Sequence, residues 1–393
     1  MRRRAFLGTT LAAASMTGRG LADEARLRVA VIGHTGRGNF GHGLDTMWKD
    51  VPGVTVVAVA DADVKGLAAA QAKLETGRGF TDYRRMLAET KPDIVAIGPR
   101  HIDQHHTMSL ASIEAGARGI YMEKPFCRTL READEIVAAC ARSGAKLALA
   151  HRNRYHPVLP VLADLLRQGK IGRVLEYRAR GKEDARGGPL DLWVLGCHLF
   201  NLIHFFAGEA RTCSATVLQE GRPVTAADLS EGAEGVGPLA GNEVHARFEM
   251  ADGLPAFFDS VQNAGVRDTG FGVQIIGTEG VLDLRVDAEP LAHWRAGSPF
   301  RPIASSSAGW IPVTSGGPGV PEPVKDIRKQ VGGHLAPALD LIAAIQEGRE
   351  PLCSAADGRH ALEMTAGVFE SHRQKGARIS LPLKEREHPW MRL

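Results

Sequence analysis

The sequence predicts two domains: an α/β domain with a doubly wound parallel sheet, followed by an α+β domain. Three observations support the first. Residues 29–32 form a short apolar run of the kind that is buried on both faces of a parallel sheet. A glycine-rich turn follows this run, and a second apolar run at 54–60 ends at an aspartate. From 64 to 150, predicted helices and strands alternate, as in parallel sheets with crossover helices.

The turn after the first strand has glycines at 33, 36, 38 and 41. Residues without a Cβ atom permit a sharp turn and let an anion approach the backbone N–H groups. We interpret it as a variant dinucleotide-binding motif, with a threonine where a second glycine is common. A plain strand-to-helix connection is the alternative. The residues expected to contact a cofactor here are Gly33, Thr35, Gly36, Arg37 and Gly38.

Asp61 ends the second strand, twenty residues after Gly41. A carboxylate in this place accepts hydrogen bonds from both ribose hydroxyls of an adenine dinucleotide and repels a 2′-phosphate. The sequence therefore predicts a Rossmann domain over residues 23–150 that binds NAD in preference to NADP. Capping of a loop is the alternative role for Asp61, and Arg37 is placed to meet a 2′-phosphate if NADP binds instead.

Two further strand ends carry polar groups. Helices are predicted at 64–74, 83–89, 104–115 and 130–142, and strands at 93–97, 118–122 and 146–150. Pro99 follows one strand and leads to His105 at the start of the next helix, and Glu123-Lys124-Pro125 follows another. Carboxyl ends of parallel strands meet at the ligand-binding edge of such a sheet. Lys124 is therefore predicted to point into the cleft; a solvated lysine is the alternative.

Composition restricts the function further. The 393 residues are 44% hydrophobic and 24% charged, with a net charge of only +3, which does not suggest a nucleic-acid partner. No apolar run reaches the ~18 residues of a membrane span. Five scattered cysteines lack the spacing of a metal site or a disulfide framework, so we predict buried thiols and no metal.

The N-terminus differs from the rest of the chain. Arg3-Arg4-Ala5-Phe6-Leu7 precedes a weakly apolar stretch and small residues up to Ala22, a layout typical of a twin-arginine export signal. We predict a signal peptide over residues 1–22 and a periplasmic protein that is exported already folded. Because the periplasm supplies no free nicotinamide nucleotide, a tightly bound cofactor is expected. A basic start on a cytoplasmic protein is the alternative.

These motifs resemble the glucose–fructose oxidoreductase/inositol dehydrogenase (Gfo/Idh/MocA) family over nearly the whole mature chain. The residues that carry the resemblance are the glycine turn, Asp61, Pro99 to His105, Ala115-Gly116, Glu123-Lys124-Pro125, 153–157, Gly187-Gly188, Cys197-His198 and 378–383. The resemblance implies that Pro99, His105 and Glu123 lie at the cofactor. It also implies that Lys124 contacts both the cofactor and the reacting hydroxyl of a sugar or cyclitol.

For residues 151–393, the resemblance implies a substrate and oligomerisation domain with an open, mostly antiparallel sheet, in a homo-oligomer. The sequence is compatible with it. Helices are predicted at 158–168, 193–207, 334–347 and 355–375, and strands at 174–181, 211–219, 243–250, 255–262, 271–277, 280–286 and 377–382. Residues 287–331 contain seven prolines and are predicted to be one long loop.

The helix at 193–207 carries the second predicted catalytic residue, His198, as general base. Redox members of the family commonly have Asp-x-x-x-His-x-x-Asp here, whereas this chain has Val194 and Asn201 at the two Asp positions. A histidine without an adjacent anion is less basic and less firmly oriented. Asp191 is a candidate replacement, and a packed core histidine is the alternative for His198. The predicted substrate contacts are Arg154, Trp193 and Asn201.

Three functions stay open at this level. The first is NAD(P)-dependent hydride transfer between the cofactor and a sugar or cyclitol. The second is glycosidase or lyase chemistry, in which a retained NAD oxidises the sugar transiently and is then reduced back. The third is a sugar-binding protein that retains a nucleotide without catalysis. We rank hydride transfer first, because it is the commonest chemistry of the family that the chain resembles.

Overall fold

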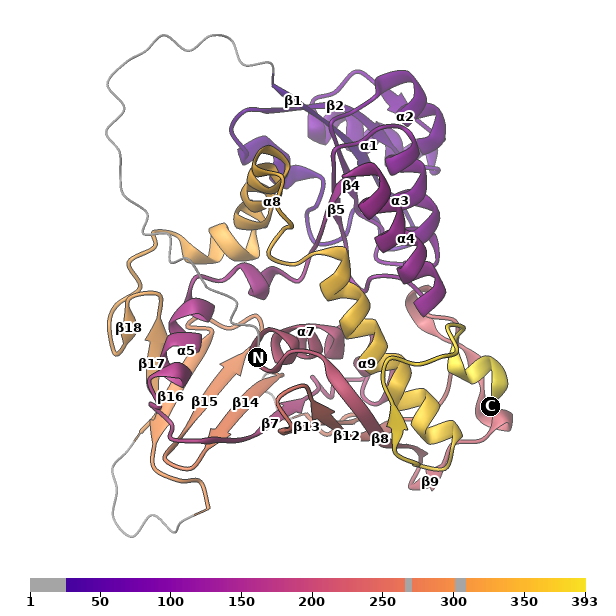
Figure 1. Ribbon diagram of the computed structural model, residues 1–393. Coiled ribbons are helices and arrows are strands. Elements are labelled where there is room, and N and C mark those ends of the chain that lie inside the picture. Colours follow the sequence, from indigo (N-terminus) through magenta and orange to yellow (C-terminus); the bar gives the residue numbers. More distant parts are fainter. Residues whose placement is uncertain (1–25, 266–270, 301–308) are drawn as a thin grey trace.

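The computed structural model describes residues 26–265, 271–300 and 309–393. The predicted signal peptide, residues 1–22, lies outside the described residues. The described chain forms two domains, each built on one large sheet (Figure 1). In the first domain six parallel strands follow the order β3-β2-β1-β4-β5-β6, which confirms the predicted doubly wound Rossmann arrangement.

The predicted elements of the first domain are confirmed to within a residue or two. Its strands are β1 (Leu27–Ile32), β2 (Val54–Ala60), β3 (Gly79–Phe80), β4 (Ile94–Ile97), β5 (Gly119–Met122) and β6 (Lys146–Leu149). Its helices are α1 (Val64–Leu74), α2 (Tyr83–Thr90), α3 (His105–Glu114) and α4 (Leu130–Ser143). Asp63 caps α1 by accepting a 2.6 Å hydrogen bond from Gly66 N. Between the glycine turn and β2 the chain forms only a short 3-10 helix, Thr46–Asp50.

The second domain has a large sheet with the order β18-β17-β16-β15-β14-β7-β13-β12-β8-β19, and β9 also pairs with β8. All of its pairings are antiparallel except β7 with β13, which confirms the mostly antiparallel sheet. Its strands are β7 (Val174–Arg180), β8 (Ala210–Gln219), β9 (Arg222–Pro223), β12 (Glu243–Met250), β13 (Pro255–Val261), β14 (Gly272–Gly277), β15 (Gly280–Arg285), β16 (Ala292–Ala296), β17 (Ile311–Thr314), β18 (Gly317–Pro318) and β19 (Ile379–Ser380). A separate small ribbon pairs β10 (Ser230–Glu231) with β11 (Pro238–Leu239).

The prediction of one long loop over 287–331 is wrong for its described part. Strands β16, β17 and β18 extend the sheet there, and Ala292 pairs with Val313. Prolines are tolerated at a sheet edge because fewer backbone N–H groups have to pair. The predicted strand at 377–382 is shorter than expected and comprises β19 alone.

Helices cover one side of the second sheet (Figure 1). They are α5 (Val158–Arg167), α6 (Pro189–Asp191), α7 (Cys197–Ala207) and α9 (Ala355–Arg373). Helix α8 (Leu335–Glu347) instead returns to the first domain, where Ala338 and Leu341 share a core cluster with Val29 and Tyr121. The chain therefore crosses between the domains again after residue 150, and this crossing brings residues before α8 to the domain boundary.

Two expectations concern the interior. The five cysteines are all free, and four of them are buried, as predicted. Among the described residues, the helix Pro189–Ala207 is long and apolar enough to span a membrane by composition, but 78% of its apolar window is buried inside the protein. Burial to this extent is typical of a helix in the core of a folded domain.

Candidate active site

A cavity of about 80 Å³ lies where the two domains meet. Both residues predicted to be catalytic line it: Lys124 from the end of β5, and His198 from α7 of the second domain. The full lining is His42, Lys124, Ala150, Arg152, Leu195, His198, Asp287 and His334. Two elements that are distant in the sequence thus present a cation and an imidazole to one small space.

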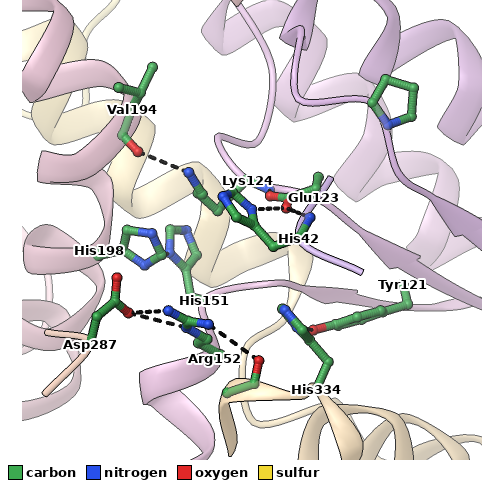
Figure 2. A network of polar contacts seen from close by, with 12 residues as sticks. His42, Tyr121, Glu123, Lys124, His151, Arg152, Val194, His198, Asp287 and His334 are labelled. Carbon is green, nitrogen blue, oxygen red and sulfur yellow. Dashed lines mark hydrogen bonds and ion pairs between the residues drawn. The ribbon is translucent and has the colours of Figure 1, made fainter. Parts of the chain in front are cut away.

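Lys124 is only 7% exposed, and its ammonium points across the domain boundary (Figure 2). Its Nζ donates a 3.1 Å hydrogen bond to the main-chain oxygen of Val194. Because an ammonium has three N–H groups, two remain for a ligand in the cavity. The prediction that Lys124 points into the cleft agrees with this placement.

Glu123 ties the same strand end to the glycine-rich turn. Its carboxylate accepts hydrogen bonds from His42 N (3.1 Å), His42 Nδ1 (2.5 Å) and the backbone N–H of Lys124 (2.8 Å). Burial raises the pKa of Glu123, but the hydrogen bond from His42 and the charge of Lys124 outweigh burial and lower it to about 2. Gly41 is required beside this carboxylate, because a Cβ there would lie 2.5 Å from Glu123 Cγ.

His198 pairs with a second histidine, His151, which follows β6. The two Nδ1 atoms are 3.2 Å apart, and the rings are perpendicular. Burial, the neighbouring His151 and the charge of Lys124 hold the pKa of His198 well below its usual range, so its ring is neutral. Burial and Lys124 likewise lower the pKa of His151 to about 3. His151 therefore lies beside His198, the candidate base, and can orient its ring. The sequence provides no carboxylate for this role.

These two histidines and Cys197 also form a set whose ligand atoms lie within 4.8 Å of one another. The sequence was expected to supply no metal ligands, so this grouping is a finding of the structure. The charge of Lys124 acts on all three groups, and a like charge so near opposes the binding of a cation.

The helix that carries His198 differs from the prediction at its start. It begins at Pro189, and Leu192–Gly196 forms a π-helical turn before α7. The main-chain oxygen of Val194, rather than a side chain, holds Lys124. Asp191 Oδ2 accepts hydrogen bonds from Ser260 Oγ (2.7 Å) and Glu183 N (3.0 Å), and within the described chain its Oδ1 is buried without a partner. Asp191 does not line the cavity, and among the described residues no hydrogen bond joins it to His198, so the structure does not place it as the missing anion.

The glycine-rich turn is open to solvent at two residues. Thr35 and Gly36 are exposed; Gly36 has φ +84°, and a Cβ on it would meet open space. The backbone N–H of Thr35 donates to Asp61 and that of Gly36 to Asn39 Oδ1 (3.1 Å). Gly33 and Gly38 have a different role, because a Cβ there would overlap the ring of Phe40 or the backbone of Arg100. Arg37 is paired with Asp103 at 2.5 Å. The turn is therefore accessible at residues 35 and 36, where a bound pyrophosphate would compete for these two N–H groups, while Gly33 and Gly38 permit close packing of the protein itself.

Asp61 has an unexpected partner. Its carboxylate accepts a 2.7 Å hydrogen bond from Thr35 Oγ1, two bonds from Thr35 N and one from Asp63 N, and the residue is only 1% exposed. A glycine in place of Thr35, as is common in such turns, would leave this carboxylate without the hydroxyl bond. Asp61 therefore stands at the predicted place, and Thr35 competes for it with any ribose hydroxyl.

Pro99 and His105 are buried together beneath this edge of the sheet. His105 Nε2 lies 2.7 Å from the oxygen of Pro99, and its Nδ1 lies 2.9 Å from that of Pro125. Both ring nitrogens are therefore used by the main chain. His105 fixes the loop after β4 against the loop that follows Lys124, so it can act on a cofactor only through these loops.

The three predicted substrate contacts are not at the cavity. Trp193 is 2% exposed and packs in the core against Phe369 and His388, which also lie against each other. Asn201 is buried beside Cys353, to which its Nδ2 donates. Arg154 lies over the ring of Phe205, with its guanidinium carbon 4.2 Å from the ring centre. The structure thus places these three side chains away from the cavity. Trp193 and Asn201 point into the protein interior from the π-helical turn and α7, and Arg154 is held on Phe205 beside Asp357.

Sequence reasoning missed the other polar residues of the cavity. Only His151 could have been predicted from the sequence to lie at the site, since it directly follows a predicted strand at the ligand-binding edge. Arg152 is paired with Asp287 at 2.5 Å, and His334 is hydrogen-bonded to Tyr121 (Figure 2). The missed residues of the site are His42, His151, Arg152, Asp287 and His334.

The fold and this cavity define an NAD-binding oxidoreductase with a catalytic edge shared between two domains. Residues 27–151 match the family model described as "Oxidoreductase family, NAD-binding Rossmann fold". Residues 163–381 match the one described as "Oxidoreductase family, C-terminal alpha/beta domain". The chain therefore belongs to the Gfo/Idh/MocA oxidoreductase family, as the resemblance indicated.

Three similar proteins illustrate the family. A D-apiose dehydrogenase of Paraburkholderia graminis is 25% identical over 352 residues, which cover 87% of each chain. A glycosyl hydrolase family 109 protein of Streptomyces coelicolor is 31% identical over 150 residues, 36% of this chain and 31% of that protein. The solved structure of levoglucosan dehydrogenase with NADH and levoglucosan has a TM-score of 0.72 at 21% identity, covering 91% of this chain and 100% of that one.

Proposed function

We propose that the protein is an NAD-dependent dehydrogenase that transfers hydride between the cofactor and a hydroxyl-bearing carbon of a sugar or cyclitol. The observation that carries this proposal is the convergence of Lys124 and His198 on one small cavity beside the dinucleotide-binding turn. The D-apiose dehydrogenase among the relatives supports a carbohydrate substrate. When bound, the nicotinamide would accept or donate the hydride.

The residues of the cavity supply the proton chemistry. Neutral His198 accepts the proton of the reacting hydroxyl at Nε2, and for this its Nδ1 hydrogen must point to His151 Nδ1, 3.2 Å away. Lys124 donates one of its two remaining N–H groups to the same oxygen as negative charge develops on it. Because His151 is neutral, it stabilises an imidazolium less than a carboxylate would. Lys124 therefore takes the larger share of the charge.

NAD is favoured over NADP in this proposal for two reasons. The carboxylate of Asp61 would repel a 2′-phosphate at the end of β2. Arg37, the cation that could have met such a phosphate, is already paired with Asp103. The relative affinities of NAD and NADP for the purified protein test this directly; tighter binding of NADP would contradict it.

Replacing Lys124 or His198 with alanine tests the catalytic assignment. Each variant should lower kcat by roughly 10²–10³, because a group that acts on developing charge typically contributes ~2.7–4 kcal/mol. The loss should be larger for Lys124, and NADH binding should change little. Lys146→Ala is the matched control, since Lys146 lies at the opposite end of the neighbouring strand β6 and pairs with Glu350. Unchanged turnover in Lys124→Ala would refute the active-site assignment.

Glycosidase chemistry with a retained, internally recycled cofactor is the second candidate. The family 109 relative supports it, and so does the finding that no carboxylate of the described residues is hydrogen-bonded to His198, whose neighbour is His151. The two candidates differ in stoichiometry. A dehydrogenase leaves one NADH, bound or free, for each sugar oxidised, whereas recycling leaves no net NADH and incorporates solvent deuterium into the product.

We further propose that residues 1–22 export the folded protein by the twin-arginine route, with its nucleotide already bound. Replacing Arg3-Arg4 with Lys-Lys should leave the folded protein in the cytoplasm, because recognition requires the arginine pair. Cell fractionation measures the outcome, and full periplasmic delivery of the variant would contradict the proposal. Release of nucleotide on denaturing the mature protein tests tight binding.

A further inference from the structure

His334 is a histidine with an unused ring nitrogen in the catalytic cavity. It directly precedes α8 with φ 63° and ψ 14°, a left-handed conformation that is uncommon for residues other than glycine. The residue is 2% exposed, and its ring lines the same cavity as Lys124 and His198 (Figure 2). Within the described part of the chain, its Nε2 is buried without a hydrogen-bond partner.

The other ring nitrogen is fixed by Tyr121 on β5. The phenol oxygen of Tyr121 lies 2.6 Å from His334 Nδ1, and Tyr121 is fully buried. Burial, with the charge of Glu123, raises the pKa of Tyr121 well above its usual value, so the phenol keeps its proton. Burial lowers the pKa of His334 to about 4, so its ring is neutral near pH 7.

These two states determine the tautomer. In the part of the chain that the structure describes, the hydrogen-bond partner of the buried Tyr121 phenol is His334 Nδ1, and the phenol donates its hydrogen to that nitrogen. Nδ1 is then the acceptor of a neutral ring, and the ring hydrogen is on Nε2. The unpartnered Nε2 is therefore an N–H donor, held in place by Tyr121 and directed at the cavity. A buried donor without a partner destabilises the protein, and the left-handed backbone at the same residue adds to this.

We propose that His334 is a substrate-binding residue that donates its Nε2–H to an oxygen of the bound sugar. The inference rests on the proposed function and deepens it. The reacting oxygen faces Lys124 and His198, and the oxygen at His334 is a second hydroxyl or a ring oxygen of the same molecule. The site thus favours a polyhydroxylated substrate over an isolated alcohol.

The tautomer is testable without knowing the natural substrate. In ¹⁵N-histidine-labelled holoprotein, long-range ¹H–¹⁵N spectra distinguish the two neutral tautomers, and Tyr121→Phe and His334→Gln assign the signals. We expect His334 to be protonated at Nε2 from about pH 6 to pH 8. An Nδ1-protonated or doubly protonated ring would overturn the inference.

Levoglucosan, D-apiose and myo-inositol, added to the same holoprotein with NADH, test the contact. A sugar that shifts the His198 signals should shift His334 Nε2 as well; a sugar that shifts His198 alone refutes the contact. If none of the three sugars shifts the signals of either histidine, both the assignment of the cavity as a sugar site and the His334 contact are refuted. If a sugar shifts His334 but none of the three reduces NAD⁺ in a separate assay without NADH, the dehydrogenase proposal fails and the contact stands.

Kinetics on a responding sugar separate a binding role from a structural one. His334→Phe keeps a ring but removes the donor, and should raise KM roughly tenfold with kcat changed by less than about threefold. His334→Gln places an amide N–H near the position of Nε2 and should recover most of the KM. Thermal unfolding of His334→Phe should show a lower Tm than the wild type, because the substitution also leaves the buried Tyr121 phenol without its acceptor; the double variant His334→Phe/Tyr121→Phe removes both groups and controls for this loss. A KM equal to wild type in His334→Phe would overturn the proposal.

Discussion

Removing the hydroxyl of Thr35 should strengthen NAD binding. Asp61 is 1% exposed, and its carboxylate already accepts a 2.7 Å hydrogen bond from Thr35 Oγ1. A ribose hydroxyl that binds Asp61 has to displace this bond. A hydrogen bond to a charged group contributes ~1.5–3 kcal/mol, and the ribose recovers only part of it. We therefore expect Thr35→Ala to lower the Kd of NADH about tenfold, which corresponds to about 1.4 kcal/mol.

Calorimetric or fluorescence titration with NADH measures this change. Thr35→Ser is the matched control, because it retains the hydroxyl and should bind NADH as the wild type does. Asp61→Ala should weaken binding, and adding Thr35→Ala to it should produce no further change, since the competing acceptor is gone. Weaker binding in Thr35→Ala, or an equal gain in the Asp61→Ala background, would show that Thr35 does not compete for this carboxylate.

Two other predictions concern the turn and the buried carboxylate beside it. Gly38→Ala should weaken NADH binding and lower Tm by several degrees, because its Cβ would lie 2.3 Å from Arg100 N. Gly36→Ala is also at positive φ but in open space, so it should lower the free energy of unfolding by only ~1–2 kcal/mol. Equal losses of stability in the two variants would contradict the packing argument. Glu123 has a pKa of about 2, below its ordinary 4.5, so its stabilisation is complete above about pH 4.5 and is lost as the pH falls towards 2. In urea unfolding, Glu123→Gln should therefore lose less free energy of unfolding than the wild type between about pH 5 and pH 3, and an equal loss would assign the acid sensitivity to other groups.

The sequence by itself determined the architecture of the first domain and one candidate catalytic residue. Apolar runs such as 29–32 and 54–60 and the glycine turn between them are features of the local sequence, and with the aspartate that follows them they favour a dinucleotide-binding fold over a plain strand-to-helix connection. Lys124 was predictable because a residue that follows a parallel strand lies at the ligand-binding edge whatever the rest of the chain does. His151 follows β6 in the same way, and the same rule applied there would have found it.

The orientation of the helix around His198 was decided by the tertiary structure. Residues 192–203 are almost all apolar, so no polar stripe indicates which side faces the cleft. The π-helical turn Leu192–Gly196 then changes the angular relation of Trp193 and Val194 to His198. For this reason Trp193 and Asn201 were assigned to the substrate and lie in the core, while Val194 holds Lys124 through its main chain.

Long-range contacts decided the remainder of the site. His334 meets Tyr121 across 213 residues, and Arg152 meets Asp287 across 135. Each of these partners lies in a segment whose local pattern specifies a strand, a helix start or a loop, but does not specify which distant residues will be its neighbours. They reach the cavity because α8 returns to the first sheet and packs Ala338 and Leu341 there. Local sequence encodes the elements and their ends, whereas the burial of apolar faces of distant segments determines which side chains share a cavity.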